Sequence, residues 1–389
     1  MTALRTNLFF VALALSLLGV VMVYSATYRF SGTEVLLVRL AHLGLGIGVF
    51  FVVSRIRYTL WRKHANVLYG VVFVALVLVL IPGVGMRING SSRWLDVGFM
   101  SLQPSEFAKI AAVVFLSCAL ARQKPGSGLP LKALAAVAVL FGLVLIEPDF
   151  GTSVVLLMGV AGALWASEVR TKDLLLSGAA GVFALAVMML LAPYRRERFL
   201  TFLDPWAVAD TSGYQNVQAM IAIKAGGVFG SGAGSGGQGA NVPEIDTDMI
   251  FALVGEELGV LGMIGVIAAF CFIAVAGVKI ALEAPSVMAR CVAAGITTML
   301  VLQAIFNMGA AMVVLPLAGI TLPFVSYGGS SLLVCFAAVG LLYRISEDSE
   351  RAREIKPRRS RRAPGRVPTR ADSRGRDGRA RDPRAVRGL

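Results

Sequence analysis

Long apolar runs separated by short polar turns are the main pattern of this sequence. Each run has at least the roughly 17 residues that a helix needs to cross the hydrocarbon core of a bilayer. We therefore predict an all-α polytopic membrane protein with about ten transmembrane helices. The predicted spans are residues 8–26, 35–54, 65–82, 105–121, 131–147, 151–168, 173–192, 248–282, 287–311 and 322–343.

The first run resembles a secretory signal peptide. Arg5 precedes the apolar residues, and the small residues of Tyr24-Ser-Ala follow them. However, a second apolar run begins within about ten residues and no soluble domain comes next. We therefore predict that the first run is retained as a transmembrane helix.

The composition, 57% hydrophobic and 15% charged residues, excludes an ordinary soluble protein. Basic residues concentrate in alternate short loops, which the positive-inside rule places in the cytoplasm together with both termini. The large loop between the seventh and eighth spans, residues 193–248, then faces outward, although it carries arginines, because long loops follow the charge rule poorly. The cytoplasmic loops hold Arg55, Arg57, Arg62, Lys63, Arg122, Lys124, Lys132, Arg170, Lys172, Lys279 and Arg290, whereas the short outer loops hold Arg29, Arg87 and Arg93.

The net charge of +14 comes mostly from the C-terminal segment. From Arg344 to Leu389 the sequence has 16 Lys or Arg and 7 Asp or Glu, a difference of +9. We predict one transmembrane domain, residues 1–345, and a disordered basic cytoplasmic tail, residues 346–389, because the tail has too few large apolar residues to fold. The tail suits an orientation signal that touches anionic lipid, or a docking site for a cytoplasmic partner. Nucleic acid is not an expected partner, since no folded reader accompanies the arginines.

The carboxylates around the start of the eighth span are the leading candidates for chemistry. Thr247 or Asp246 is predicted to cap a helix that begins at about Asp248. Asp248 would then sit at the mouth of the membrane, where soluble groups and lipid head groups can both reach it. Glu256 follows about 12 Å further along the helix axis, with Glu257 beside it. Charge at that depth usually has a task or a partner.

The outer loop also offers cationic groups and flexible backbone. Arginines alternate with aromatic residues from Tyr194 to Trp206, which suits either a helix in the membrane interface or guanidinium groups that hold a diphosphate. Residues 226–239 contain eight glycines, which suits either a hinge or a backbone-amide cradle for phosphate. The Gly-Lys-Ser/Thr of a nucleotide-binding loop does not follow. The candidate substrate-binding residues are Arg93, Arg195, Arg196, Arg198, Lys224 and Glu244.

Further polar residues lie in or beside other apolar runs. Their better interpretation is structural, because polar groups between transmembrane helices hold helices together; Glu106 and Asp149 are the first exceptions to consider. No metal-ligand spacing is present among the two histidines and four cysteines. A transporter and a membrane enzyme both fit this pattern. The residues of this group are Glu106, Lys109, Glu147, Asp149, Glu256, Glu257, Gln303, Asn307 and Ser326.

Ordered motifs between about residue 8 and residue 345 resemble the SEDS family, named for shape, elongation, division and sporulation. Each motif falls in a loop or at a helix end. The motifs at residues 22–26 and 147–152, with the long basic tail, are more similar to the FtsW branch than to the RodA branch. The motifs are Met22-Val-Tyr-Ser-Ala26, Gly90-Ser-Ser-Arg-Trp94, Gln103-Pro-Ser-Glu106, Glu147-Pro-Asp-Phe-Gly-Thr152, Phe202-Leu-Asp-Pro205, Gly213-Tyr-Gln215, Pro243-Glu244, Thr247-Asp248, Gly255-Glu-Glu-Leu-Gly259 and Pro323-Phe-Val-Ser-Tyr-Gly-Gly-Ser-Ser331.

The resemblance implies a peptidoglycan glycosyltransferase of the bacterial inner membrane. Such enzymes polymerise lipid II on the outer face by inverting β-1,4 transfer, and the family's essential acid corresponds to Asp248. The resemblance also implies a class B penicillin-binding protein and other division proteins as partners, and a divalent cation, Mg²⁺ or Mn²⁺, as the cofactor to consider. This chain departs from the family at Met249, where phenylalanine is usual, and in its shorter segment ahead of Pro243. A lipid II flippase, a RodA-like elongation polymerase and a division scaffold stay open as alternatives.

Overall fold

The computed structural model describes residues 1–88, 91–98, 100–191 and 193–360. The chain divides into two units, Met1–Ala352 and Arg353–Leu389. The helices are α1 (Thr2–Ser31), α2 (Glu34–Arg55), α3 (Tyr58–Leu80), α4 (Pro104–Leu120), α5 (Leu131–Ile146), α6 (Phe150–Trp165), α7 (Thr171–Leu191), α8 (Pro193–Leu203), α9 (Tyr214–Gly226), the short 3₁₀ helix η1 (Gly239–Asn241), α10 (Ile250–Leu282), α11 (Val287–Ala311) and α12 (Gly329–Ser360). The strands are β1 (Gly85–Ile88), β2 (Ser91–Asp96) and β3 (Ser101–Leu102).

Each of the ten predicted spans corresponds to one helix of the first unit. Within the described residues, seven helices are long and apolar enough to cross a membrane: α1, α2, α3, α7, α10, α11 and α12. Helices α4, α5 and α6 are shorter, with 17, 16 and 16 residues. The prediction of an all-α polytopic membrane protein is confirmed.

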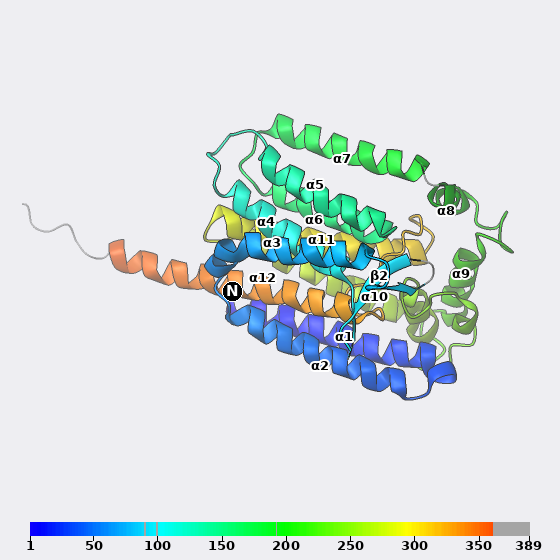
Figure 1. Cartoon of the computed structure of the whole chain (residues 1–389). Coiled ribbons are helices and arrows are strands. Elements are labelled where there is room, and N and C mark those ends of the chain that lie inside the picture. The colour runs from blue at the N-terminus through cyan, green and yellow to red at the C-terminus, as the bar shows by residue number, and fades with distance from the viewer. Residues whose placement is uncertain (89–90, 99, 192, 361–389) are drawn as a thin grey trace, which may run out of the picture. The chain divides into compact units, whose positions relative to one another are not determined.

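The apolar helices run side by side through the first unit, and Figure 1 shows the small elements gathered at one end of them. The strands, α8 and α9 lie at the end opposite the N-terminus. Helix α11 packs against α4, α6 and α10 and is largely buried. By contrast, no residue in the most apolar stretch of α7, residues 171–190, is buried. Helix α7 therefore presents its apolar side chains to the surroundings, as a lipid-facing helix does.

The three-stranded antiparallel sheet was not predicted. Its order is β1-β2-β3, and it forms the connection between α3 and α4. Helix α9, inside the outer loop, was also missed, whereas α8 matches the predicted interfacial helix of arginines and aromatic residues. Short strands and helices in loops lack the long apolar periodicity on which the span prediction depended.

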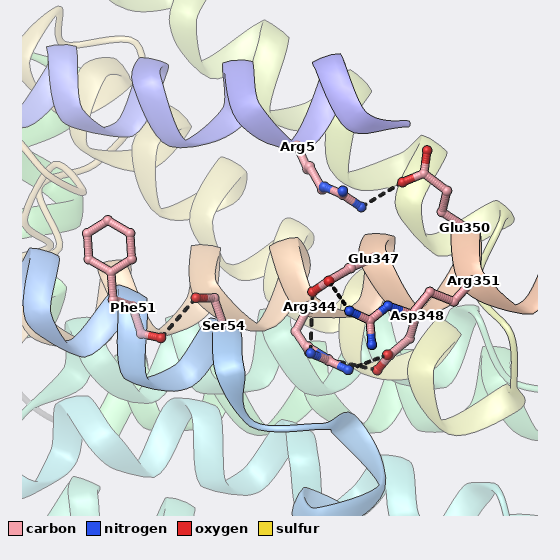
Figure 2. Close-up of polar contacts among 8 residues, drawn as sticks. All are labelled: Arg5, Phe51, Ser54, Arg344, Glu347, Asp348, Glu350 and Arg351. Carbon is pink, nitrogen blue, oxygen red and sulfur yellow. Dashed lines mark hydrogen bonds and ion pairs between the residues drawn. The ribbon is translucent and has the colours of Figure 1, made fainter.

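Helix α12 continues beyond the predicted domain boundary at residue 345. Arg344 donates to Asp348 at 2.6 and 3.0 Å and pairs with Glu347 at 3.3 Å, and Arg351 pairs with Glu347 at 2.6 Å (Figure 2). Such pairs at i, i+3 and i, i+4 stabilise a helix, so residues 346–352 extend α12 within the first unit. Helix α12 ends at Ser360, so residues 346–360 of the predicted disordered tail are helical, and residues 361–389 lie outside the described residues.

The start of α1 is tied to this extension of α12. Arg5 donates to the Glu350 carboxylate at 2.7 Å (Figure 2), and the Thr2 hydroxyl donates to the same group at 2.7 Å. The Arg5 guanidinium also lies over the ring of Tyr343, 5.4 Å from its centroid. Charged and cation–π contacts thus join the first and last transmembrane helices at the end of the unit opposite α8 and α9.

Candidate active site

Asp248 lies in a turn, not at the start of a helix. Helix α10 begins at Ile250, two residues after the predicted start at about Asp248, and Met249 is in the N-cap position, so the prediction that Thr247 or Asp246 caps this helix is wrong. The Thr247 hydroxyl instead donates to the Glu244 carboxylate at 2.9 Å. The Met249 amide donates to the Glu244 carbonyl at 3.1 Å and closes the turn.

The backbone of this turn is held by residues from other helices. The side-chain amide of Asn307, in α11, donates to the Asp248 carbonyl at 2.8 Å and to the Ile320 carbonyl at 2.7 Å. The Ser326 hydroxyl donates to the Thr247 carbonyl at 2.6 Å. Because these carbonyls are fixed by buried polar partners, the Asp248 carboxylate projects from a defined backbone position.

The segment that supplies Ser326 is held in turn by a buried cation. Arg39, in α2, is only 1% exposed and donates through one nitrogen to the carbonyls of Phe324 and Val325, at 2.9 and 3.1 Å. The Tyr327 amide, two residues later, donates to the Asp246 carbonyl at 2.7 Å. A chain of hydrogen bonds therefore runs from α2 to the turn before α10. The sequence carried a signal for Arg39, a lone charge within an apolar run.

The side chains of Arg198 and Asp248 both approach Gly319. A Cβ atom placed on Gly319 would lie 3.6 Å from Oδ2 of Asp248 and 3.8 Å from Nη1 of Arg198. Burial raises the pKa of Asp248 to about 6; Arg198 lowers it, and the negative charges of Glu244, Asp149 and Asp246 raise it. Asp248 can therefore bind and release a proton near neutral pH.

Two further carboxyl groups, those of Glu147 and Asp149, lie between α5 and α6. Asp149 caps α6 by accepting from the Thr152 amide at 3.0 Å, and its other oxygen accepts from Gln103 at 2.9 Å. Glu147 is 1% exposed, and burial, together with the charge of Asp149, raises its pKa to about 9 against the opposing effect of Arg93. Glu147 is therefore protonated at neutral pH. Arg93 donates to the carbonyl oxygens of residues 147 and 148 at 3.0 and 2.8 Å, so two of its donors hold this turn.

The glycine-rich segment does cradle an anion, but the anion belongs to the protein. The carboxylate of Glu256 accepts from the backbone amides of Gln238 and Gly239 at 2.8 and 2.6 Å. Two glycines of the segment approach α10 so closely that a Cβ would overlap its backbone: Gly226 at the carbonyl of Gly255, and Gly230 at the carbonyl of Glu257. The segment is thus a structural partner of α10. The amides of Gln238 and Gly239 already donate to Glu256, so they do not bind a phosphate.

The same segment provides backbone hydrogen-bond partners at a break in α10. Gly259 has φ 66° and ψ −166°, which interrupts the helix. The amides freed beyond the break, those of Val260 and Leu261, donate to the carbonyls of residues 227 and 228 at 3.0 and 3.3 Å. The carbonyls freed before it, those of Glu256 and Glu257, accept from the amides of residues 231 and 232 at 2.9 and 3.0 Å. Satisfied backbone groups are what allow a helix to be broken at membrane depth.

Glu256→Gln is expected to loosen this segment. A carboxamide has a single acceptor oxygen and presents NH₂ to the second amide, so one charge-assisted hydrogen bond, worth about 1.5–3 kcal/mol, is lost. Amide hydrogen exchange of residues 228–240 should accelerate by roughly tenfold or more. Glu244→Gln, which neutralises an exposed carboxylate of the same outer loop, should leave that exchange unchanged. Equal acceleration in both variants would contradict the assignment.

The remaining predicted site residues lie apart from Asp248 or at the surface. Arg196 and Lys224 are exposed, and the side chain of Arg195 lies outside the described residues. Glu257 accepts from the Ser25 hydroxyl of α1. Lys109 pairs with Glu106 at 2.8 Å near the start of α4, and both side chains are buried.

Acidic residues do not converge on a metal site in the described part of the chain. No group of three or more His, Cys, Asp or Glu residues there could hold a metal ion. The acidic groups that act on Asp248, namely Glu244, Asp149 and Asp246, influence its charge without forming such a group. The described residues therefore offer no cluster of side chains that would hold a cation without further ligands.

Comparison with known proteins covers nearly the whole transmembrane unit. The family described as "Cell cycle protein", that of FtsW, RodA and SpoVE, matches residues 5–351. Stage V sporulation protein E of Bacillus subtilis is 37% identical over 364 residues, which are 90% of this chain and 100% of that protein. A protein of Coxiella burnetii named as a probable peptidoglycan glycosyltransferase FtsW is 39% identical over 355 residues, 87% of this chain and 95% of that protein.

Solved structures agree with this assignment. A chain from a peptidoglycan synthase complex, described as coordinating polymerization and crosslinking, aligns with a TM-score of 0.74 at 31% identity, covering 88% of this chain and 97% of that one. The rod shape determining protein RodA of Thermus thermophilus aligns with a TM-score of 0.66 at 28% identity, covering 88% and 96%. The family match, the level of identity and the shared fold all lead to one conclusion: the chain belongs to the FtsW/RodA/SpoVE family of cell cycle proteins.

Proposed function

We propose that this protein is a peptidoglycan glycosyltransferase that polymerises lipid II into glycan strands. The observation that carries the proposal is the Asp248 carboxyl group, which has a pKa of about 6 and lies with Arg198 next to Gly319. Relatives that carry the name of peptidoglycan glycosyltransferase cover most of this chain. The description of the family as cell cycle proteins, with several FtsW relatives, also favours a role in septal wall synthesis during division over one in elongation.

The reaction requires a base on one face of the donor sugar. The donor is a glycan joined through an α-linked diphosphate to undecaprenol, and the product is a β-1,4 linkage, so the anomeric centre inverts. The 4-hydroxyl of the acceptor sugar attacks the anomeric carbon from the side opposite the diphosphate. The new C–O bond forms as the bond to the diphosphate breaks, and Asp248 takes the hydroxyl proton. The undecaprenyl diphosphate leaves with the electron pair.

Arg198 tunes the base in this mechanism. Its charge lowers the pKa of Asp248 and so keeps part of the base ionised at neutral pH. A divalent cation that enters with the diphosphate is compatible with the site, since Mg²⁺ is often held by one or two carboxylates plus substrate phosphates.

The proposal places Asp248 on the outer side of the bacterial inner membrane. The basic short loops and both ends of the transmembrane unit would lie in the cytoplasm, as the positive-inside rule indicates. A class B penicillin-binding protein is the proposed partner, because one structural relative belongs to a complex that joins polymerization and crosslinking. Other division proteins are proposed as further partners.

The polymerase can be distinguished from a flippase with purified protein. Full-length protein in detergent, given radiolabelled lipid II, should yield glycan polymer that a muramidase digests. A flippase in detergent yields none, because it only moves its substrate across a bilayer. Absence of polymer, even with a cognate class B penicillin-binding protein present, would reject the proposal.

The rate of polymerisation should follow the ionisation of Asp248. Since the base must be deprotonated, kcat/KM is expected to rise with pH and level off above about 6, falling roughly tenfold per pH unit below that value. Glu244→Gln removes a negative charge that raises the pKa of Asp248, so it should move the acid limb to lower pH. The measurement is initial polymerisation rate at low lipid II concentration from pH 4.5 to 8. An acid limb that stays in place or moves upward in Glu244→Gln would contradict the assignment.

A further inference from the structure

A cavity of about 400 Å³ lies beside Asp248, between α8 and the start of α9. The proposed mechanism uses one of its residues, Arg198. The cavity has an open side and is large enough for a sugar unit and part of its neighbour. Its lining residues are Glu197, Arg198, Thr201, Thr211, Ser212, Tyr214, Gln215, Asn216, Pro243 and Leu317.

The lining has the chemistry of a site for an uncharged, hydroxyl-rich ligand. Hydroxyl groups and side-chain amides dominate it, and both donate and accept hydrogen bonds. The opposite charges of Glu197 and Arg198 balance each other. Tyr214 is 39% exposed, which leaves its ring accessible for packing against the apolar face of a sugar.

Asn216 provides the observation that points to a ligand. It is 3% exposed and lines the cavity, yet its side-chain amide makes no hydrogen bond with the part of the chain that the structure describes. Asn216 is not among the side chains whose polar atoms are both sealed from solvent and without a partner, so its oxygen and nitrogen can be reached from the cavity and are available to a ligand there. The carbonyl and NH₂ of asparagine suit the acetamido group and neighbouring hydroxyl of an N-acetylated sugar.

Other polar groups of the cavity are already fixed in position. The Thr201 hydroxyl donates to the Ser212 hydroxyl at 2.9 Å, which joins α8 to the segment before α9. The Gln215 side-chain nitrogen donates to the Pro243 carbonyl at 3.1 Å, which joins α9 to the turn that leads to Asp248. The walls of the cavity are therefore preorganised, which reduces the entropy lost when a ligand binds.

We propose that this cavity is a glycan subsite that holds the sugar unit next to the reacting pair. Arg198 lines the cavity and also shares the space above Gly319 with Asp248, so the two sites are adjacent. The inference rests on the proposed function for the identity of the glycan, a β-1,4-linked chain of N-acetylated sugars. A diphosphate fits the cavity less well, because Arg198 is the single cation among the lining residues and Glu197 opposes it.

A soluble oligosaccharide tests this subsite independently of polymerisation. The probe is chitotetraose, the β-1,4-linked tetramer of N-acetylglucosamine, titrated into full-length protein in detergent and followed by saturation-transfer NMR or calorimetry. We expect saturable binding that Asn216→Ala weakens about tenfold and Tyr214→Ala weakens to a similar degree. Asn241→Ala changes an exposed asparagine of the same outer loop and should bind as the unchanged protein does. Melting temperatures of all variants identify any that fail to fold.

Polymerisation kinetics give a second measurement. Asn216→Ala should raise KM for lipid II, or shorten the glycan product, with little change in kcat, because the subsite binds sugar away from the reacting atoms. Chitotetraose that does not bind, or that binds equally well to the Asn216 and Tyr214 variants, would overturn the subsite. So would inorganic pyrophosphate that occupies the cavity and displaces the sugar. Asn216-dependent binding without any polymer from lipid II would support the subsite and reject the polymerase.

Discussion

Asp248→Asn is expected to reduce polymerisation of lipid II by about 10²–10⁴-fold, the range for loss of a general base. Asparagine has nearly the same shape but cannot take the proton of the attacking hydroxyl. The hydrogen bond from Asn307 reaches the backbone carbonyl of residue 248, so the substitution leaves that contact in place. The loss should therefore appear in kcat, while the protein still folds and still binds lipid II.

The matched control is Asp210→Asn. Asp210 is an exposed aspartate of the same outer loop, and the same chemical change there should leave the polymerisation rate within about twofold, as expected for a surface position. The measurement is initial polymer formation by both variants at saturating lipid II, with melting temperatures to verify folding. Polymer formed by Asp248→Asn at a rate close to that of Asp210→Asn would remove the general base from the mechanism.

Lys109→Met is expected to destabilise the protein by about 3–5 kcal/mol, the cost of leaving one member of a buried ion pair without its partner. Lys109 is 1% exposed, pairs with Glu106 at 2.8 Å and donates to Gln303 at 3.3 Å. Gln303 in turn donates to the Thr321 carbonyl at 3.0 Å. Removing the cation leaves the Glu106 carboxylate buried next to apolar atoms and leaves the Gln303 oxygen without its donor.

A double variant separates the ion pair from simple packing. Lys109→Met combined with Glu106→Leu removes both charges, and an apolar pair of similar volume is often as stable as the ion pair it replaces. We expect the melting temperature in detergent to fall strongly in Lys109→Met and to recover most of the loss in the double variant. A double variant less stable than Lys109→Met would contradict this explanation, because removal of the unpaired carboxylate should relieve the cost of burying it.

The sequence predicted the transmembrane helices well because their signal is local. A run of apolar residues reports its own burial in lipid, whatever the rest of the chain does. The start of α10 was misplaced because Thr247, a good N-cap residue in isolation, donates instead to Glu244. The glycine-rich segment was ambiguous for the same reason, since its anion, Glu256, comes from a different element.

Asp248 could be chosen from the sequence, but the residues that position it could not. A carboxylate at the end of an apolar run is visible in one stretch of chain. Arg39, Asn307 and Ser326 contact the turn and its supporting segment from far away in the sequence, so only the folded chain brings them together. Asn216 was missed because one asparagine in a polar loop carries no pattern of its own.

The crossing of the glycine-rich segment over the break in α10 also limits how this sequence can change over time. At Gly226, Gly230 and Gly259 a single methyl group would meet backbone atoms of the segment packed against it. Two of these positions have positive φ. Gly237, by contrast, has open space around it. Substitutions are therefore expected to accumulate at Gly237 and to be eliminated at the other three glycines. A segment with the composition of a flexible linker is thus in part as constrained as a hydrophobic core.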